Sequence, residues 1–132
     1  MQKKWSLGLL VALALTALTL TWLYRQKKKA EFDAATPFDK GWLLIARSGC
    51  TDCHQGESSY RAPVLKGLIG RTVKLADGRE VIADAAYVKR ALLTPKLDIS
   101  AGYQGIMPSY EGRLSEEEIA LITIALAPPP AS

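Results

Sequence analysis

The five residues Cys50-Thr51-Asp52-Cys53-His54 constrain this chain more than any other part of its sequence. Two cysteines three positions apart, followed at once by a histidine, are typical of covalent attachment of a c-type haem. Two intervening residues let both thiols reach neighbouring vinyl groups of one porphyrin, and the next side chain can then bring its imidazole to the iron. The 132-residue chain has two cysteines and one histidine, and all three lie in this motif. We therefore predict one covalent haem c.

Three other kinds of site use a similar motif. A thioredoxin-like redox pair needs a strand before the motif, whereas residues 37–48 predict a helix. A structural zinc site needs four ligands, and the motif offers three, so zinc would require a second chain. A plain disulfide would close one short loop with little entropic benefit and would leave His54 without a role. The motif favours haem, and a membrane-tethered thiol–disulfide oxidoreductase remains the alternative of a different class.

The second axial ligand of the iron is predicted to be Met107. Bis-histidine ligation is excluded because His54 is the single histidine, and of the two methionines Met1 lies beyond the predicted membrane anchor. Met107 follows His54 by 53 residues and lies in a loop rich in glycine and proline. A thioether favours Fe(II), so the couple is expected to be fairly oxidising. Lysine or tyrosine ligation remains open and would lower the potential, whereas an open site would suit a sensor or a peroxidase.

The N-terminal region predicts a membrane anchor. Residues 5–24 carry no charge, and twenty helical residues span about 30 Å, the thickness of a hydrocarbon core. Trp5 at one end, and Trp22 with Tyr24 at the other, match interfacial aromatic belts. Basic residues follow the apolar run instead of a small-residue cleavage site, which disfavours a signal peptide. We predict an anchor at residues 1–24 and a flexible charged tether at residues 25–36.

Charge is distributed unevenly along the chain. Residues 1–29 hold six Lys and Arg and no acid, whereas residues 30–132 hold eleven basic and thirteen acidic residues, a net charge of −2. This distribution gives no indication of a nucleic-acid partner. The anchor has two basic residues before it and four after it, so the positive-inside rule would place the domain in the cytoplasm. Covalent haem attachment in bacteria implies the outer face, and we give it more weight because whole domains translocate despite local charge.

The remaining sequence predicts a small helical domain at residues 37–127 and a proline-rich tail at residues 128–132. Local signals predict three helices and a hairpin around Asp77-Gly78. The helices have N-terminal caps at Thr36, Asp84 and Ser115, the last with Glu118 as a capping box. Their expected ranges are 37–48, 85–93 and 116–126, and an irregular loop at residues 96–113 carries Met107.

This pattern resembles the class I cytochromes c over about residues 36–126, and most closely the haem domains tethered to haem–copper oxidases. The resemblance rests on the first helix with Gly41, CTDCH, Ala-Pro-Val-Leu, Gly-Leu-Ile-Gly-Arg, the ADGREV hairpin, Ala86-Tyr87, GYQGIMPSY and LSEEEI. It implies an all-α fold with crossed N- and C-terminal helices around one haem. It also implies that the carbonyl of Pro63 accepts a hydrogen bond from His54 and that Arg71 binds a haem propionate. Ile45 and the aromatic-free last helix depart from the family pattern.

These expectations combine into one function. We expect a non-enzymatic electron carrier with its haem domain on the periplasmic face of a bacterial inner membrane, with other redox subunits as partners and no small-molecule substrate. Electrons would pass from a quinol-oxidising complex to a terminal acceptor such as an oxidase. An electron-accepting subunit of a periplasmic dehydrogenase is the alternative. The last helix is apolar on all sides after Glu118, which suggests that it buries a second face against another subunit or the membrane.

Overall fold

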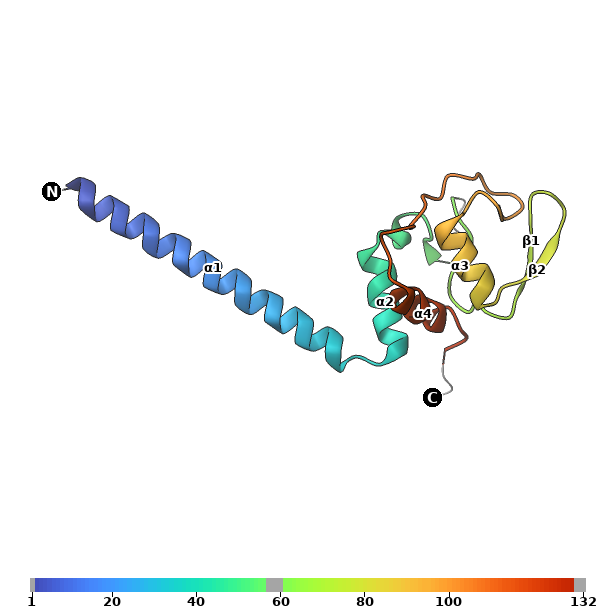
Figure 1. The fold of residues 1–132 in the computed structure, drawn as a ribbon, viewed down its shortest axis with the longest axis horizontal. Helices are drawn as coiled ribbons and strands as arrows, with labels where there is room; N and C mark the ends of the chain where they lie inside the picture. Colours follow the sequence, from blue (N-terminus) through green and yellow to red (C-terminus); the bar gives the residue numbers. More distant parts are fainter. Residues whose placement is uncertain (1, 57–60, 130–132) are drawn as a thin grey trace. The chain divides into compact units, whose positions relative to one another are not determined.

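The computed structural model describes residues 2–56 and 61–129. The end of the predicted tail, residues 130–132, and the side chain of Trp5 lie outside the described part, as do residues 1 and 57–60. In chain order the elements are α1 (Gln2–Ala34), α2 (Pro37–Arg47), the short 3₁₀ helix η1 (Cys50–Asp52), β1 (Thr72–Lys74), β2 (Glu80–Ile82), α3 (Ala85–Leu93) and α4 (Glu116–Ala125). The described residues are thus mostly helical with one small sheet, as predicted (Figure 1).

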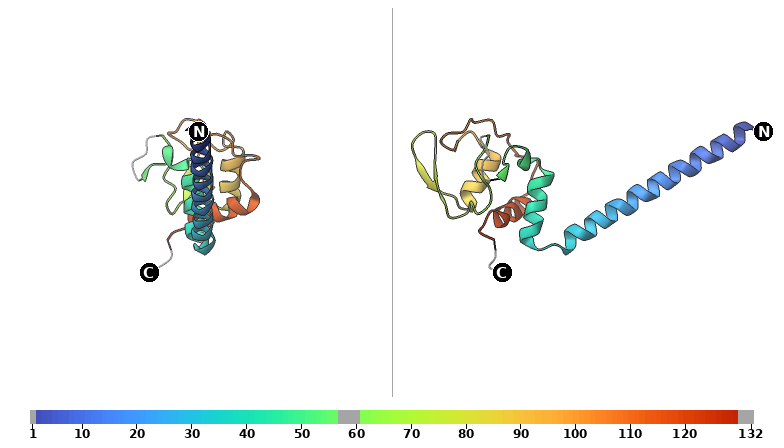
Figure 2. Two further views of the ribbon diagram at one scale, coloured as in Figure 1. Left: turned by 90° about the vertical axis from the view of Figure 1, so that its left-hand side faces the viewer. Right: turned by 180° about the vertical axis from the view of Figure 1, so that it is seen from behind.

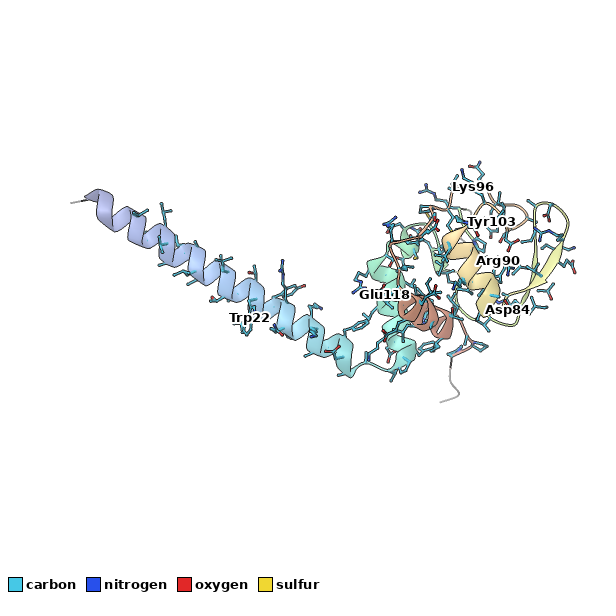
Figure 3. All side chains as sticks on the ribbon, viewed as in Figure 1. Trp22, Asp84, Arg90, Lys96, Tyr103 and Glu118 are labelled. Carbon is cyan, nitrogen blue, oxygen red and sulfur yellow. The ribbon has the colours of Figure 1, made fainter. Side chains whose placement is uncertain are left out.

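The chain divides into two compact units, Met1–Ala35 and Thr36–Ser132. The first unit contains α1, which is long and apolar enough to cross a membrane. Its leucines and Trp22 are exposed, and Figure 3 shows Trp22 projecting from the helix. A lipid-facing segment should have this character, because apolar side chains without a protein partner need an apolar solvent.

The flexible tether predicted at residues 25–36 is wrong for most of its length, because α1 continues as a helix to Ala34. Lysine, arginine, glutamate and alanine have high helix propensity, and a helix that is already nucleated extends at low cost. Lys28 and Glu31 form an ion pair 3.2 Å long across one turn of the extension. Only Ala35 and Thr36 separate α1 from α2.

The second unit is organised by α2 and α4, which pack against each other more extensively than any other two helices (Figures 1 and 2). Gly41 of α2 permits this close approach, because a Cβ atom there would collide with the backbone of Leu121 and the side chain of Ala125. Arg47 and Glu118 add an ion pair 2.7 Å long between the two helices. The crossed arrangement implied by the resemblance is therefore present.

The helix starts follow the local signals of the sequence. The hydroxyl of Thr36 accepts a hydrogen bond from the Asp39 amide, and the carboxylate of Asp84 accepts one from the Tyr87 amide. Ser115 and Glu118 form the predicted capping box. Each cap satisfies amide groups that a helix start leaves without partners.

The core joins α2, α3 and α4 to the loops between them. Its buried apolar side chains are Leu44, Ile45, Leu75, Tyr87, Val88, Leu92, Tyr110, Ile119, Ile122 and Leu126. One side of α4 faces this core, whereas Ile124 on α4 and Leu43 on α2 remain 44% and 48% exposed. β1 and β2 form an antiparallel pair in which Val73 lies opposite Val81.

Candidate functional site

A cavity of about 300 Å³ lies inside the second unit. Its walls come from the end of α2, from η1, from α3, from α4 and from the loops before and after α3. The lining is mainly aliphatic and aromatic, with a few polar groups at its margin. Small-molecule and cofactor sites have this size and character.

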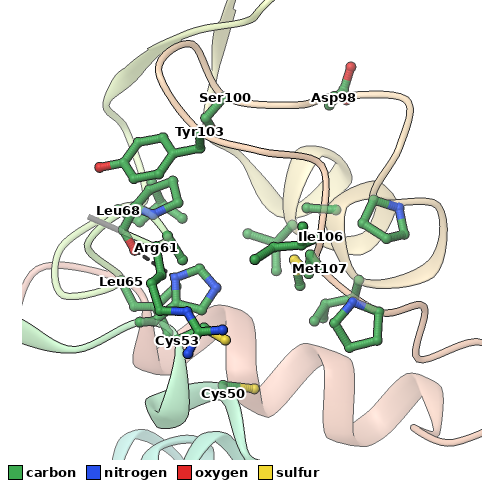
Figure 4. Close-up of a pocket in the computed structure, with 18 of the residues that line it drawn as sticks. Cys50, Cys53, Arg61, Leu65, Leu68, Asp98, Ser100, Tyr103, Ile106 and Met107 are labelled. Atoms are coloured by element: carbon green, nitrogen blue, oxygen red, sulfur yellow. Dashed lines mark hydrogen bonds between the residues drawn. The ribbon is translucent and has the colours of Figure 1, made fainter. Parts of the chain in front are cut away.

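Both cysteines face this cavity from the segment that follows α2. The helix ends at Arg47, and Gly49 adopts a left-handed conformation with φ 75° that turns the chain into η1. The carbonyl of Cys50 then accepts hydrogen bonds from the amides of Cys53 and His54, 3.2 and 2.9 Å long. One tight turn therefore carries both thiols and the imidazole, and Figure 4 shows Cys50 and Cys53 together at one edge of the cavity.

The imidazole of His54 is oriented by a hydrogen bond that the resemblance implied. Its Nδ1 lies 2.6 Å from the carbonyl oxygen of Pro63. Because a carbonyl can only accept, Nδ1 carries the proton and donates it, and Nε2 is the nitrogen that remains able to bind a metal. Burial lowers the pKa of His54, although the bond to Pro63 acts in the opposite direction. The neutral ring is therefore favoured, which is the form that ligates metals.

Met107 lines the same cavity and comes from the loop between α3 and α4. Figure 4 shows Met107 and its neighbour Ile106 across the cavity from Leu65 and Leu68. Ile106 is 53% exposed, so the chain at this point lies between the cavity and the solvent. The structure thus brings Cys50, Cys53, His54 and Met107 to one apolar space.

The structure places Arg71 elsewhere. Its guanidinium donates to the carbonyl of Gly67 over 2.7 Å and to the carbonyl of Lys66, and its side chain does not line the cavity. Arg61, which the sequence reasoning missed, lines the cavity in its place, near Cys53 (Figure 4). No spacing or motif distinguishes Arg61 in the sequence, so only the folded arrangement reveals it.

Tyr110 is a second residue that the sequence reasoning missed as part of the site. Its hydroxyl donates to the carbonyl of Ser48 over 3.0 Å, and the thiol of Cys50 lies 3.9 Å from the same oxygen. Its ring is buried, and burial raises the pKa of Tyr110. Three positions after Met107, it joins the methionine loop to the segment that carries the cysteines. The sequence signal was the GYQGIMPSY stretch, in which Tyr110 is the last residue.

The thiols, the imidazole and the thioether at the cavity are of the chemical types that could hold a covalent haem. Among residues 2–56 and 61–129, no three His, Cys, Asp or Glu side chains cluster as a metal site would require. Cys50 is buried, and burial raises the pKa of its thiol, whereas the attacking thiol of a thiol–disulfide enzyme is exposed and has a lowered pKa. An apolar cavity with two thiols at one edge, an imidazole beside them and a thioether opposite suits a planar apolar group bound through sulfur.

No protein-family model matches the sequence, and no curated protein matches it either.

Proposed function

We propose that this protein is a membrane-anchored one-electron carrier that holds one haem c covalently. The observation that carries the proposal is the convergence of Cys50, Cys53, His54 and Met107 on a single apolar cavity. These four include every cysteine and histidine of the chain, so its thiol and imidazole ligands are gathered in one place.

Each of these residues has a distinct task. The thiols of Cys50 and Cys53 would form the two thioether bonds to the porphyrin, and Nε2 of His54 would bind the iron on one side. Pro63 fixes the ring orientation of His54 and raises its basicity as a ligand. The thioether of Met107 would close the opposite side and exclude small molecules. When bound, the haem supplies an iron that changes between Fe(II) and Fe(III), so one electron is gained or lost without bond-making on a substrate.

The cavity lining would also favour electron transfer. Aliphatic and aromatic side chains exclude water, which limits the solvent rearrangement that accompanies a change of charge. Arg61 at the margin is the cation best placed to meet a propionate, and the assignment of Arg71 to that role stays a prediction.

The anchor favours a carrier that works beside a fixed partner. About ten helical residues of α1 follow Tyr24, and at 1.5 Å per residue they extend the helix by roughly 15 Å beyond the apolar segment. We propose a single-pass protein of a bacterial inner membrane with its haem domain on the periplasmic face. The exposed Leu43 and Ile124 would contact another subunit, and electrons would pass from a quinol-oxidising complex to an acceptor such as an oxidase. An electron-accepting subunit of a periplasmic dehydrogenase remains the alternative within this class.

The test is chemical and uses the full chain purified in mild detergent from cells that can attach haem c. After denaturation and extraction with acidified acetone, we expect the pigment to stay on the polypeptide and its mass to exceed that of the bare chain by one haem. The reduced protein should not bind carbon monoxide. A colourless polypeptide of unmodified mass whose two thiols react with a labelling reagent would overturn the proposal in favour of a thiol–disulfide enzyme.

A further inference from the structure

Asp98 is the one buried charged side chain in the described part of the chain, and its side chain is 4% exposed. A carboxylate removed from water is strongly unfavourable unless cations and hydrogen-bond donors compensate it. It stands in the loop that carries Met107, nine residues before the methionine. Figure 4 shows Asp98 at the outer margin of the cavity, turned away from Met107.

Two arginines from other elements compensate this carboxylate. Nε of Arg90, on α3, lies 2.9 Å from Oδ2 of Asp98, and Nη2 of Arg79, beside the hairpin turn, lies 3.3 Å from Oδ1. Arg79 is itself held by Asp77 at 2.7 Å and donates to the carbonyl of Leu97. Figure 3 shows Arg90 on α3. Asp98 is therefore a junction at which the hairpin, α3 and the methionine loop meet.

The backbone beside this junction is hydrogen-bonded to the hairpin. The carbonyl of Ile99 accepts from the Ala76 amide over 2.7 Å, and the Ala101 amide donates to the carbonyl of Lys74 over 2.8 Å. Among the described residues, the next bonds from this loop to another element after Ala101 are those of Ser109 and Tyr110 to the end of α3.

The path from the junction to the methionine is short. The side chain of Ile99, the next residue after Asp98, fills the space against Gly105, where a Cβ atom would lie 2.7 Å from its Cδ1. Gly105 precedes Met107 by two residues. A displacement at Asp98 would therefore move Ile99 and, through it, the backbone that leads into Met107.

We propose that Asp98 is a positioning residue for the second axial ligand: held by Arg79 and Arg90, it fixes the loop that presents Met107 to the cavity. The inference rests on the proposed function, because it concerns how firmly the loop would hold the thioether toward the iron of the proposed haem. With the junction broken, the loop opens more often, and an added ligand gains access in proportion to the open fraction.

The experiment uses the full-length haem-loaded protein and compares Asp98→Asn with Lys89→Gln. Lys89 is the matched control, since it precedes Arg90 on the same helix and forms an exposed ion pair with Glu116 at 2.8 Å. Three quantities are measured: the sulfur-to-iron absorption of the oxidised protein, its affinity for added imidazole, and hydrogen exchange at the Ala101 amide.

For Asp98→Asn we expect about a tenfold rise in imidazole affinity. Both arginines are half-exposed, so the loop loses less stabilisation than it would from the loss of a fully buried ion pair. The sulfur-to-iron absorption should weaken, and the Ala101 amide should exchange faster. Lys89→Gln should match the wild type in all three. A merely structural role would lower the unfolding midpoint and leave the imidazole affinity of the folded protein unchanged.

A second pair of variants decides the matter if Asp98→Asn does not fold. Arg90→Gln should reproduce the rise in imidazole affinity. Arg90→Lys keeps the charge, so its imidazole affinity should lie between those of Arg90→Gln and the wild type. Suppose the wild type shows haem and sulfur-to-iron absorption, and no junction variant changes the imidazole affinity. The inference about Asp98 is then wrong, whereas the proposed function stands. A wild type without haem would overturn the proposed function, and this inference with it.

Discussion

The two sides of the cavity are built in different ways. The histidine side, which comprises Cys50, Cys53, His54 and Pro63, comes from fourteen consecutive positions and is closed by one tight turn and one short hydrogen bond. The methionine side, residues 95–110, is held by contacts with the hairpin, with α3 and with the end of α2. A locally closed segment forms at low entropic cost, whereas a loop held at its ends opens more easily. We therefore expect the histidine side to hold the proposed haem and the methionine side to tune it.

The largest effect should follow from removing the covalent link on the histidine side. In Cys50→Ala/Cys53→Ala we expect no pigment to survive extraction, because no thioether bond can form. The apolar cavity would then lose the group proposed to fill it, so cooperative unfolding should weaken or disappear. Absorbance of the extracted polypeptide and far-ultraviolet circular dichroism check both points. Retention of covalent pigment would contradict the assignment of the sulfurs.

The next effect should come from the methionine side alone. Met107→Leu conserves volume, so we expect covalent haem to remain and stability to change by less than about 1.5 kcal/mol. The proposed sixth ligand is then absent, so carbon monoxide should bind the reduced protein, and the potential should fall by on the order of 0.1 V within the ~0.8 V range that axial ligands span. Redox titration and carbon monoxide difference spectra measure this. An unchanged potential and spectrum would remove Met107 from its role and point to lysine or tyrosine.

A smaller effect should follow from changing the helix pair that supports the histidine side. Gly41→Ala inserts a methyl group against the backbone of Leu121, and overpacking of this kind costs about 1–3 kcal/mol. We expect a lower urea midpoint with the sulfur-to-iron absorption intact in the folded protein. Gly8→Ala is the control, since a Cβ atom there meets nothing within 4 Å. Equal midpoints for the two variants would show that the close approach of α2 and α4 is not tight.

The contrast between local and long-range contacts also explains which features could be predicted from the sequence. The caps at Thr36, Asp84 and Ser115 are local, and each was predicted at the residue where the structure has it. The flexible tether predicted at residues 25–36 is wrong up to Ala34, because the helix propensity of these residues favours continuation of α1.

The junction at Asp98 could not be predicted, because its partners follow no sequence period and depend on how the hairpin packs against α3. Arg61 and Arg71 show the same limit. The sequence offers two arginines near the motif, and only the fold decides which one lines the cavity.

The smallest effect should come from the hydroxyl of Tyr110, which joins the two sides. Tyr110→Phe removes the bond to the carbonyl of Ser48 and leaves the buried ring in place, so we expect a loss of about 0.5–1.5 kcal/mol. If that bond couples the sides, imidazole affinity should rise about two- to threefold, less than for Asp98→Asn, because the amide of Tyr110 still donates to Leu92. Tyr24→Phe is the control, since Tyr24 lies on α1, is exposed and does not line the cavity. Equal imidazole affinities for Tyr110→Phe and the wild type would mean that the two sides behave independently, and the methionine side would then depend on the hairpin and α3 alone.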